Sequence, residues 1–190
     1  MFVLEARNER IAVFLLALLM AATRIGHFGL GQIAPDASTA VFFLAGLLIG
    51  NPLWALALLA EALLLDLTAI KAIGIEAVCV TTGYGLLIPA YGSLWLAARF
   101  VRATEKLDLF SAVKLVCACG FGLVAFFLFS NIGYYLGGGF DVSMGLAEYA
   151  RRVVRYFPYY LISTFFYSIV GIAVVVLAAH FAPQRHLASR

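Results

Sequence analysis

Long apolar runs, interrupted by charges at only a few points, are the dominant pattern along this chain. Four stretches contain no Asp, Glu, Lys or Arg, over residues 37–60, 77–98, 115–140 and 156–184. A helix needs roughly 20 apolar residues to cross the hydrocarbon core of a bilayer. Inside the first stretch, Asn51-Pro52 is a turn pair that ends one helix and begins another. The pattern therefore predicts several membrane-spanning helices.

Six spans are predicted when the apolar segment that begins at Ile11 is added to these runs. They cover about 11–30, 35–50, 53–70, 78–99, 113–137 and 157–181. The second is short for a bilayer crossing, which leaves a tilted or partly re-entrant helix open. Gly137–Gly139 marks a helix exit, and Met144–Tyr156 is predicted to form a separate, Arg-rich amphipathic segment. We expect one transmembrane domain over residues 1–190.

Composition narrows the class of protein. Of the 190 residues, 64% are hydrophobic and 12% charged, whereas soluble domains carry about 25% charged residues. A soluble domain, a disordered chain and a nucleic-acid binder are therefore excluded. No small-residue cleavage site follows the first apolar run cleanly, so we interpret it as a retained helix and not as a signal peptide. The expected fold class is an all-α integral membrane protein.

Lys and Arg in the connections predict the orientation, because they accumulate on the cytoplasmic side. With the N-terminus inside, the inner segments hold Arg7, Arg10, Arg99, Arg102, Lys106, Lys114, Arg185 and Arg190. The outer segments hold Arg24, Lys71, Arg151, Arg152 and Arg155. Eight inner against five outer cations favour cytoplasmic termini. The three outer arginines in one connection oppose this bias, which favours a binding contact for them.

Among the residues inside predicted spans and away from the cytoplasmic span ends, four ionisable ones are notable, because charge there is costly and usually faces a cavity or a partner. They are Arg24, His27, Glu61 and Asp66. Glu61 and Asp66 point about 140° apart on an ideal helix, so they do not form a carboxylate pair. For Glu61 the simplest interpretation is a hydrogen-bonded anchor between helices. For Asp66 a structural ion pair with Lys71 or an arginine stays open beside a functional role.

Cys79 stands where the fourth span begins, and a helix N-terminus favours the thiolate of such a residue. A thiolate is a soft metal ligand or a nucleophile. No CxxC pair, zinc-spaced Cys/His cluster or hydrolase triad accompanies it. A lone thiol suits one axial position on a metal that a macrocycle already holds, and a buried inert cysteine is the alternative. Cys117 and Cys119 are assigned to packing, on different sides of their helix.

Aromatic residues gather near predicted span ends, which is typical of an interfacial belt. They are Tyr84, Tyr91, Trp95, Tyr134, Tyr135, Tyr156, Tyr159 and Tyr160. Tyr84, five positions after Cys79, is the one that we assign to a binding site instead. In the first span, Ala17 and Ala21 form a small-residue pair suited to close helix contact.

Several segments, taken in order, resemble the BtuM family of predicted vitamin B12 transporters, which are related to the substrate-binding S-components of energy-coupling-factor transporters. They are 24–29 (RIGHFG), 35–46 (PDASTAVFFLAG), Asp66, 79–84 (CVTTGY), 87–92 (LIPAYG), and Arg151-Arg152 ahead of 156–160 (YFPYY). The resemblance runs over most of the chain. The order, length and six-span count carry it together, since no single segment is specific.

The resemblance implies a six-helix S-component-like bundle in the bacterial inner membrane, with a corrinoid pocket on its outer side. It implies that Cys79 is the axial cobalt ligand of cobalamin and that Asp66, Tyr84 and Arg152 line the pocket. Cobalamin is then the bound substrate, and the protein has no cofactor of its own. Ala17 and Ala21 fall where S-components dock on an energising module, although many members of this family lack an obvious dedicated module.

The expected function is uptake of cobalamin by a transport protein that is not an enzyme. A thiolate bound to Co(III) is expected to labilise the opposite cyano ligand or assist reduction, as side chemistry at Cys79. The alternative is a membrane enzyme that uses Cys79 as a redox thiol or nucleophile, with His27 as the base within reach. A third hypothesis is an assembly partner that binds no small molecule and uses Ala17 and Ala21 as its surface.

Overall fold

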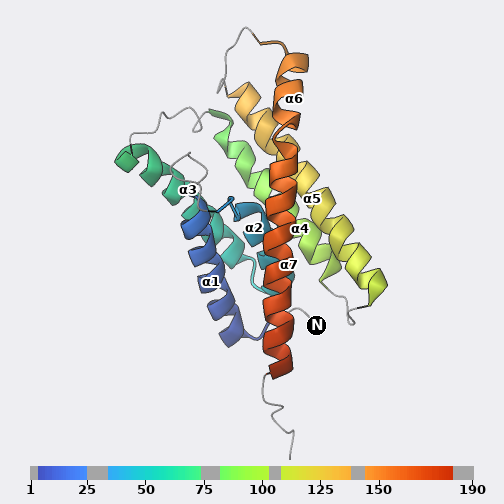
Figure 1. Cartoon of the computed structure of the whole chain (residues 1–190). Helices are drawn as coiled ribbons and strands as arrows, with labels where there is room; N and C mark the ends of the chain where they lie inside the picture. The colour runs from blue at the N-terminus through green and yellow to red at the C-terminus, as the bar shows by residue number, and fades with distance from the viewer. Residues whose placement is uncertain (1–3, 25–33, 74–81, 103–107, 138–143, 182–190) are drawn as a thin grey trace, which may run out of the picture.

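The computed structural model describes residues 4–24, 34–73, 82–102, 108–137 and 144–181, and within them the chain forms helices and no β-strand (Figure 1). The helices are α1 (Ala6–Arg24), α2 (Ser38–Leu48), α3 (Leu53–Ile73), the short 3-10 helix η3 (Thr82–Leu86), α4 (Leu87–Val101), α5 (Leu109–Leu136), α6 (Leu146–Val154) and α7 (Phe157–Phe181). The predicted all-α fold is confirmed for these residues.

The long helices alternate in direction along the chain. In Figure 1, α1, α3 and α5 finish at the same end of the molecule, where α6 also lies, and α2, α4 and α7 run back from it. Hydrogen bonds agree with this arrangement at both ends of α2. Arg24, at the end of α1, contacts Ser38 at the start of α2, and the backbone amide of Leu4 donates to the Leu48 carbonyl at 3.0 Å.

The central helix is α2, and all eleven of its residues are buried. A helix that is apolar on every side belongs in an interior, and α1, α3, α4 and α7 surround this one. Gly46 permits the closest approach, because a Cβ there would overlap the backbone carbonyl of Trp95. Eleven residues rise only about 16 Å, so α2 is shorter than a bilayer core. The predicted span 35–50 therefore contains a short, buried helix, and the crossing by a tilted or partly re-entrant helix stays a prediction.

Polar side chains close the end of α2 that faces away from Ser38. Arg99 donates from Nη1 to the Gly50 carbonyl at 3.1 Å, and Arg102 donates to the Ile49 carbonyl at the same distance. The Glu9 carboxylate accepts from the Gly50 amide. Cations at a helix C-terminus satisfy carbonyls that have no partner inside the helix and interact favourably with the helix dipole.

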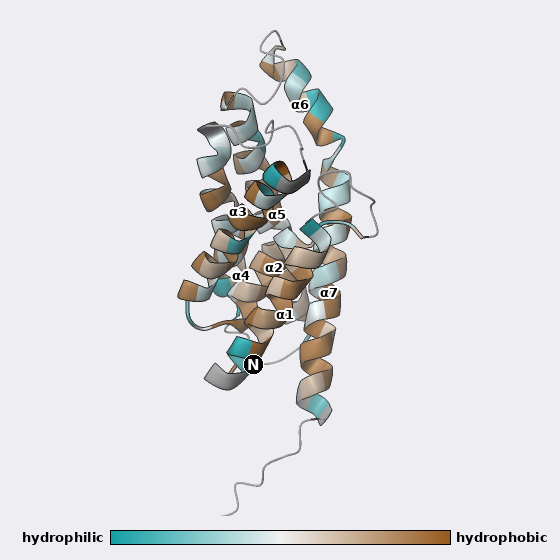
Figure 2. Cartoon of the chain, turned by 90° about the vertical axis from the view of Figure 1, so that its left-hand side faces the viewer, coloured by the Kyte–Doolittle hydropathy of each residue, from teal (hydrophilic) through white to brown (hydrophobic). Residues whose placement is uncertain are grey.

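The outer surface of the helices is strongly apolar. On α5 and α7 alone, the exposed large apolar side chains are Leu109, Phe110, Val113, Val116, Phe121, Val124, Leu128, Phe129, Ile132, Leu136, Tyr159, Leu161, Ile162, Phe166, Ile169, Val170, Val174 and Leu177. Soluble monomers rarely expose so much contiguous apolar surface. Figure 2 shows hydrophobic residues along α1, α2 and α7 and a larger hydrophilic share on α6.

Three segments among the described residues are long and apolar enough to cross a membrane. They are Leu53–Lys71, Leu109–Leu136 and Leu146–Ala178, the last of which extends over α6 and α7. Together with the apolar outer surface, they indicate a membrane protein.

Element boundaries follow the sequence pattern closely. The break at Asn51-Pro52 is confirmed, and Asn51 Oδ1 accepts from the Leu53 amide at 3.0 Å, which caps α3. The last helix has the predicted bounds, and α6 is a separate amphipathic helix as expected. The predicted span 78–99 is divided between η3 and α4, and residues 78–81 lie outside the described residues. The first helix begins five residues earlier than predicted, at Ala6.

Candidate functional site

A buried ion pair joins α1 to α3 at the end of the bundle where α1 finishes. Arg24 donates from Nε to Asp66 Oδ1 at 2.7 Å and from Nη2 to Asp66 Oδ2 at 2.6 Å. Both residues are only 5% exposed. This is the bidentate geometry in which a guanidinium matches a carboxylate, and it is among the stronger hydrogen-bonded pairings in proteins. The sequence left open an ion pair between Asp66 and either Lys71 or an arginine. The structure contains the pair with an arginine.

The other nitrogen of the guanidinium connects the pair to α2 and α4. Arg24 Nη1 donates to Ser38 Oγ and to Tyr91 Oη, each at 2.8 Å. Ser38 is held in turn by Asp36, whose Oδ1 accepts from the serine hydroxyl at 2.6 Å and from its amide at 2.9 Å. Four of the five N–H groups of Arg24 thus have partners. A buried charge requires such satisfaction, since unpaired it is strongly destabilising.

Tyr84 completes this network from η3, because its hydroxyl donates to Asp66 Oδ2. Two glycines bring η3 close enough. Gly83 meets Gly133 of α5 backbone to backbone, and a Cβ on Gly83 would overlap the Gly133 carbonyl. The neighbouring Gly85 has no atom within 4 Å of its would-be Cβ. Close packing at Gly83 therefore positions Tyr84 over Asp66.

Tyr91 differs from the prediction of an interfacial belt. It is only 4% exposed, its ring stacks on Phe42 with centroids 4.3 Å apart, and Phe126 lies 5.0 Å away on another side. Its hydroxyl accepts from Arg24. An aromatic residue near a span end looks the same in sequence whether it faces lipid or core, so the belt interpretation of Tyr91 is wrong. Asp36, Ser38 and Tyr91 are the members of the network that sequence reasoning missed.

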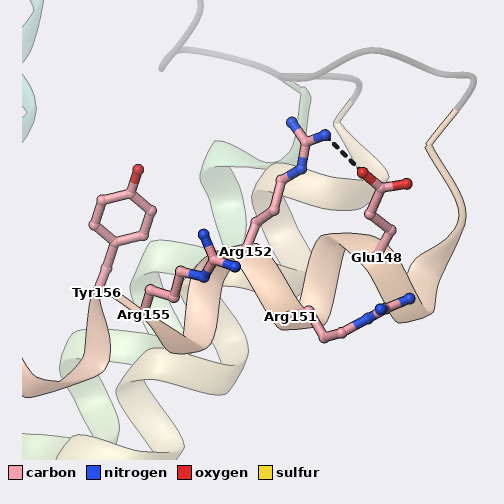
Figure 3. Close-up of a pocket in the computed structure, with 5 residues that line it drawn as sticks. All are labelled: Glu148, Arg151, Arg152, Arg155 and Tyr156. Carbon is pink, nitrogen blue, oxygen red and sulfur yellow. Dashed lines mark hydrogen bonds and ion pairs between the residues drawn. The ribbon is translucent and has the colours of Figure 1, made fainter.

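The predicted site residues are only partly brought together. Asp66 and Tyr84 are in direct contact, although they are 18 positions apart. Arg152 lies on α6, where it bonds to Glu148 at 2.6 Å, with more than half of each side chain exposed (Figure 3). Cys79 and His27 lie outside the described residues. Of the four predicted ligand residues, Asp66 and Tyr84 therefore lie in the buried network, and Arg152 lies on α6.

Other sequence predictions have mixed outcomes. Cys119 packs in the core at 2% exposed, as expected, but the packing assignment is wrong for Cys117, which is exposed on α5. The two face different directions as predicted. Glu61 is half-buried on α3. Ala17 and Ala21 are half-buried on α1.

The network is a polar cluster whose members satisfy one another, formed by side chains of α1, α3, α4, η3 and the start of α2. Asp66 accepts from two Arg24 nitrogens and from Tyr84, so its charge is balanced and its orientation is fixed. Such a cluster holds a carboxylate and a phenol in a defined place between α1, α3 and η3. Within the described ranges, no group of three or more His, Cys, Asp or Glu could hold a metal ion by itself.

Comparison with known proteins does not assign this chain to a family. Neither the protein-family models nor the curated proteins contain a match to this chain. Function therefore has to be argued from the residues and their arrangement.

Proposed function

We propose that this protein belongs to the BtuM family, binds cobalamin at the outer side of a bacterial inner membrane and mediates its uptake. Six helices cross the membrane in this proposal, with both termini in the cytoplasm. The Cys79 thiolate is the axial cobalt ligand, and Asp66, Tyr84 and Arg152 contact the corrinoid. The vitamin is the substrate, and its corrin ring supplies the four equatorial cobalt ligands, so one protein thiolate is sufficient on the axial side.

The contact between Asp66 and Tyr84 is the observation that supports this proposal most. The resemblance assigns both residues to one pocket, and they come from separate helices. Tyr84 donates to Asp66, and Arg24 holds the carboxylate from the other side. Cys79 stands five positions before Tyr84 in the sequence. Tyr84 is only half-buried, and its hydroxyl oxygen can accept a hydrogen bond from the amide groups around a corrin ring while its proton is donated to Asp66.

A transport role fits the distribution of polar residues better than an enzymatic one. Arg24 and Tyr84 both donate to Asp66 at one end of the helices, and the central helix α2 is buried along its whole length. This arrangement suits a protein that receives a large ligand on one side. An enzyme that used Cys79 as its nucleophile would need a general base next to the thiol, and the base that the sequence offers is His27, which lies outside the described residues.

Binding of cyanocobalamin to the purified protein, measured by titration calorimetry, tests the proposal. Tyr84→Phe removes one hydroxyl and leaves the Arg24–Asp66 pair in place. We expect it to weaken binding about tenfold, as loss of one hydrogen bond to a charged or polar partner does. Tyr159→Phe is the matched control, because Tyr159 is an exposed tyrosine at the start of α7. It is expected to bind like the parent.

Arg152→Gln extends the test to α6 and is expected to weaken binding by a similar factor. No measurable binding by the folded parent would refute the function. Parent-like affinity in both Tyr84→Phe and Arg152→Gln would refute this placement of the pocket.

A further inference from the structure

The short helix α6 has two sharply separated faces. On an ideal helix, Arg151, Arg155, Glu148 and Arg152 fall within an arc of about 100°. The apolar residues Tyr149, Val153, Leu146, Ala150, Val154 and Ala147 fill the remaining arc in that order. Across one boundary, Ala147 lies about 40° from Arg151, and Val154 lies about 60° from it. The helix therefore presents a charged edge directly beside an apolar one.

The charged face forms a hollow of about 630 Å³ that is lined by Glu148, Arg151, Arg152, Arg155 and Tyr156 (Figure 3). Glu148 neutralises Arg152 through a 2.6 Å ion pair. The hollow keeps a surplus of two positive charges, from three arginines and one glutamate. Arg151 and Arg155 are one helical turn apart and supply this surplus. A planar guanidinium group matches the oxygens of a phosphate.

The apolar face lies over a second hollow, of about 390 Å³, between α5 and α6. Its lining residues are Phe127, Leu128, Asn131, Ile132, Tyr135, Leu136, Leu146, Tyr149, Ala150, Val153 and Val154. Tyr149 fixes α6 there, because its hydroxyl donates to the Asn131 carbonyl at 2.9 Å and its ring lies 5.0 Å from that of Tyr135. The groove is held in place by these contacts, and Leu146, Val154, Leu128 and Leu136 stay exposed along it.

We propose that α6 binds a phospholipid with an anionic headgroup. Arg151 and Arg155 hold the phosphate, and an acyl chain lies along Ala150 and Val154 in the α5–α6 groove. A free phosphate would use only the charged hollow, and a neutral lipid would use only the groove. A single amphiphile that carries both a phosphate and an apolar chain matches two hollows that α6 lines with its charged and its apolar face.

The position of α6 along the chain agrees with this occupant. It leads directly into α7, whose apolar surface faces outward, and Tyr156 and Tyr159 are exposed at the junction. Tyrosines at such a junction are typical of the headgroup level of a bilayer. Cations near a membrane surface are attracted to anionic lipids. On the proposed orientation these arginines also oppose the positive-inside bias, and a bound phosphate compensates their charge.

Lipid retention measured by native mass spectrometry, on detergent-purified full-length protein without corrinoid, tests this proposal. The probes are dipalmitoyl phosphatidylglycerol, dipalmitoyl phosphatidylcholine and dipalmitoylglycerol, each added at the same concentration, and inorganic phosphate as competitor. The parent is expected to retain phosphatidylglycerol in preference to the other two lipids. Inorganic phosphate at equal concentration is expected not to displace it.

Two variants separate the headgroup from the chain. Arg151→Gln with Arg155→Gln removes the surplus charge, and Ala150→Trp fills the groove without a change of charge. Each is expected to lower phosphatidylglycerol retention by about tenfold or more. Lys71→Gln is the matched control, since it removes an exposed cation from the last turn of α3 and is expected to retain lipid like the parent.

Unchanged retention in either variant, or equal retention of phosphatidylcholine by the parent, would overturn the proposal. Displacement by inorganic phosphate would replace it with a simple anion site. Melting temperatures of the variants verify that each is folded. The lipid series on the parent decides the question even if a variant fails to fold. No outcome depends on cobalamin, so the proposed function and this inference can fail separately.

Discussion

Replacing Arg24 with methionine removes the charge that balances Asp66 while keeping a long side chain in the same space. Asp66 is 5% exposed, and its remaining partner is then the Tyr84 hydroxyl. Breaking a buried pair in this way typically costs about 3–5 kcal/mol, because the remaining charge has neither water nor a counterion. For a chain of this size, that corresponds to a fall in melting temperature of roughly 6–20 °C.

The double variant Arg24→Met, Asp66→Leu separates this cause from simple loss of packing. Neither charge is left uncompensated, so the double variant is expected to be more stable than Arg24→Met alone by about 1–3 kcal/mol. Arg10→Met on the same helix is the control. Arg10 is exposed, so its replacement is expected to change stability by less than about 0.5 kcal/mol.

Unfolding in detergent micelles, followed by the fluorescence of Trp54 and Trp95, measures all three variants. If Arg24→Met unfolds like Arg10→Met, or if the double variant is less stable than Arg24→Met, the ion pair does not have the role described above.

Three further predictions concern packing, the Tyr91 hydroxyl and orientation. Gly83→Ala forces η3 away from Gly133 and is expected to cost about 1–3 kcal/mol in the same unfolding assay, whereas Gly85→Ala, which meets no atom within 4 Å, is expected to be neutral. Tyr91→Phe leaves one Arg24 N–H unsatisfied and is expected to cost about 1–3 kcal/mol, and a parent-like midpoint would contradict its place in the network. In a background without native cysteines, a membrane-impermeant maleimide on intact cells is expected to label Ser143→Cys and not Ser189→Cys, and the reverse pattern would invert the proposed orientation.

Helix positions were predictable from the sequence because they depend on local signals. Asn51-Pro52 ends one helix, Gly137 follows the last residue of another, and the alternating Arg and apolar residues of α6 define its two faces. These features need no knowledge of distant residues. The central place of α2 was not predicted, because an apolar segment looks the same in sequence whether lipid or other helices surround it.

Which side chains contact one another was not predictable, because these contacts join residues that are far apart in the chain. Arg24 and Asp66 were both identified as ionisable residues inside spans, but their 42-residue separation leaves the pairing open. The sequence offered Lys71 as an equal partner, and only the packing of α1 against α3 selects Arg24. Tyr91 was misassigned for the same reason, since burial of one face of α4 depends on its neighbours.

The visible spectrum of cyanocobalamin bound to the purified protein tests the central proposal most directly. Cobalt ligation by the Cys79 thiolate, with the benzimidazole arm displaced, predicts a clear shift from the spectrum of the free vitamin. Cys79→Ser keeps the size of the side chain but removes the soft donor, so the shift is expected to disappear. Cys117→Ser is the matched control at an exposed cysteine and is expected to shift like the parent. An unshifted parent spectrum, or the same shift in Cys79→Ser, would contradict cobalt ligation by Cys79.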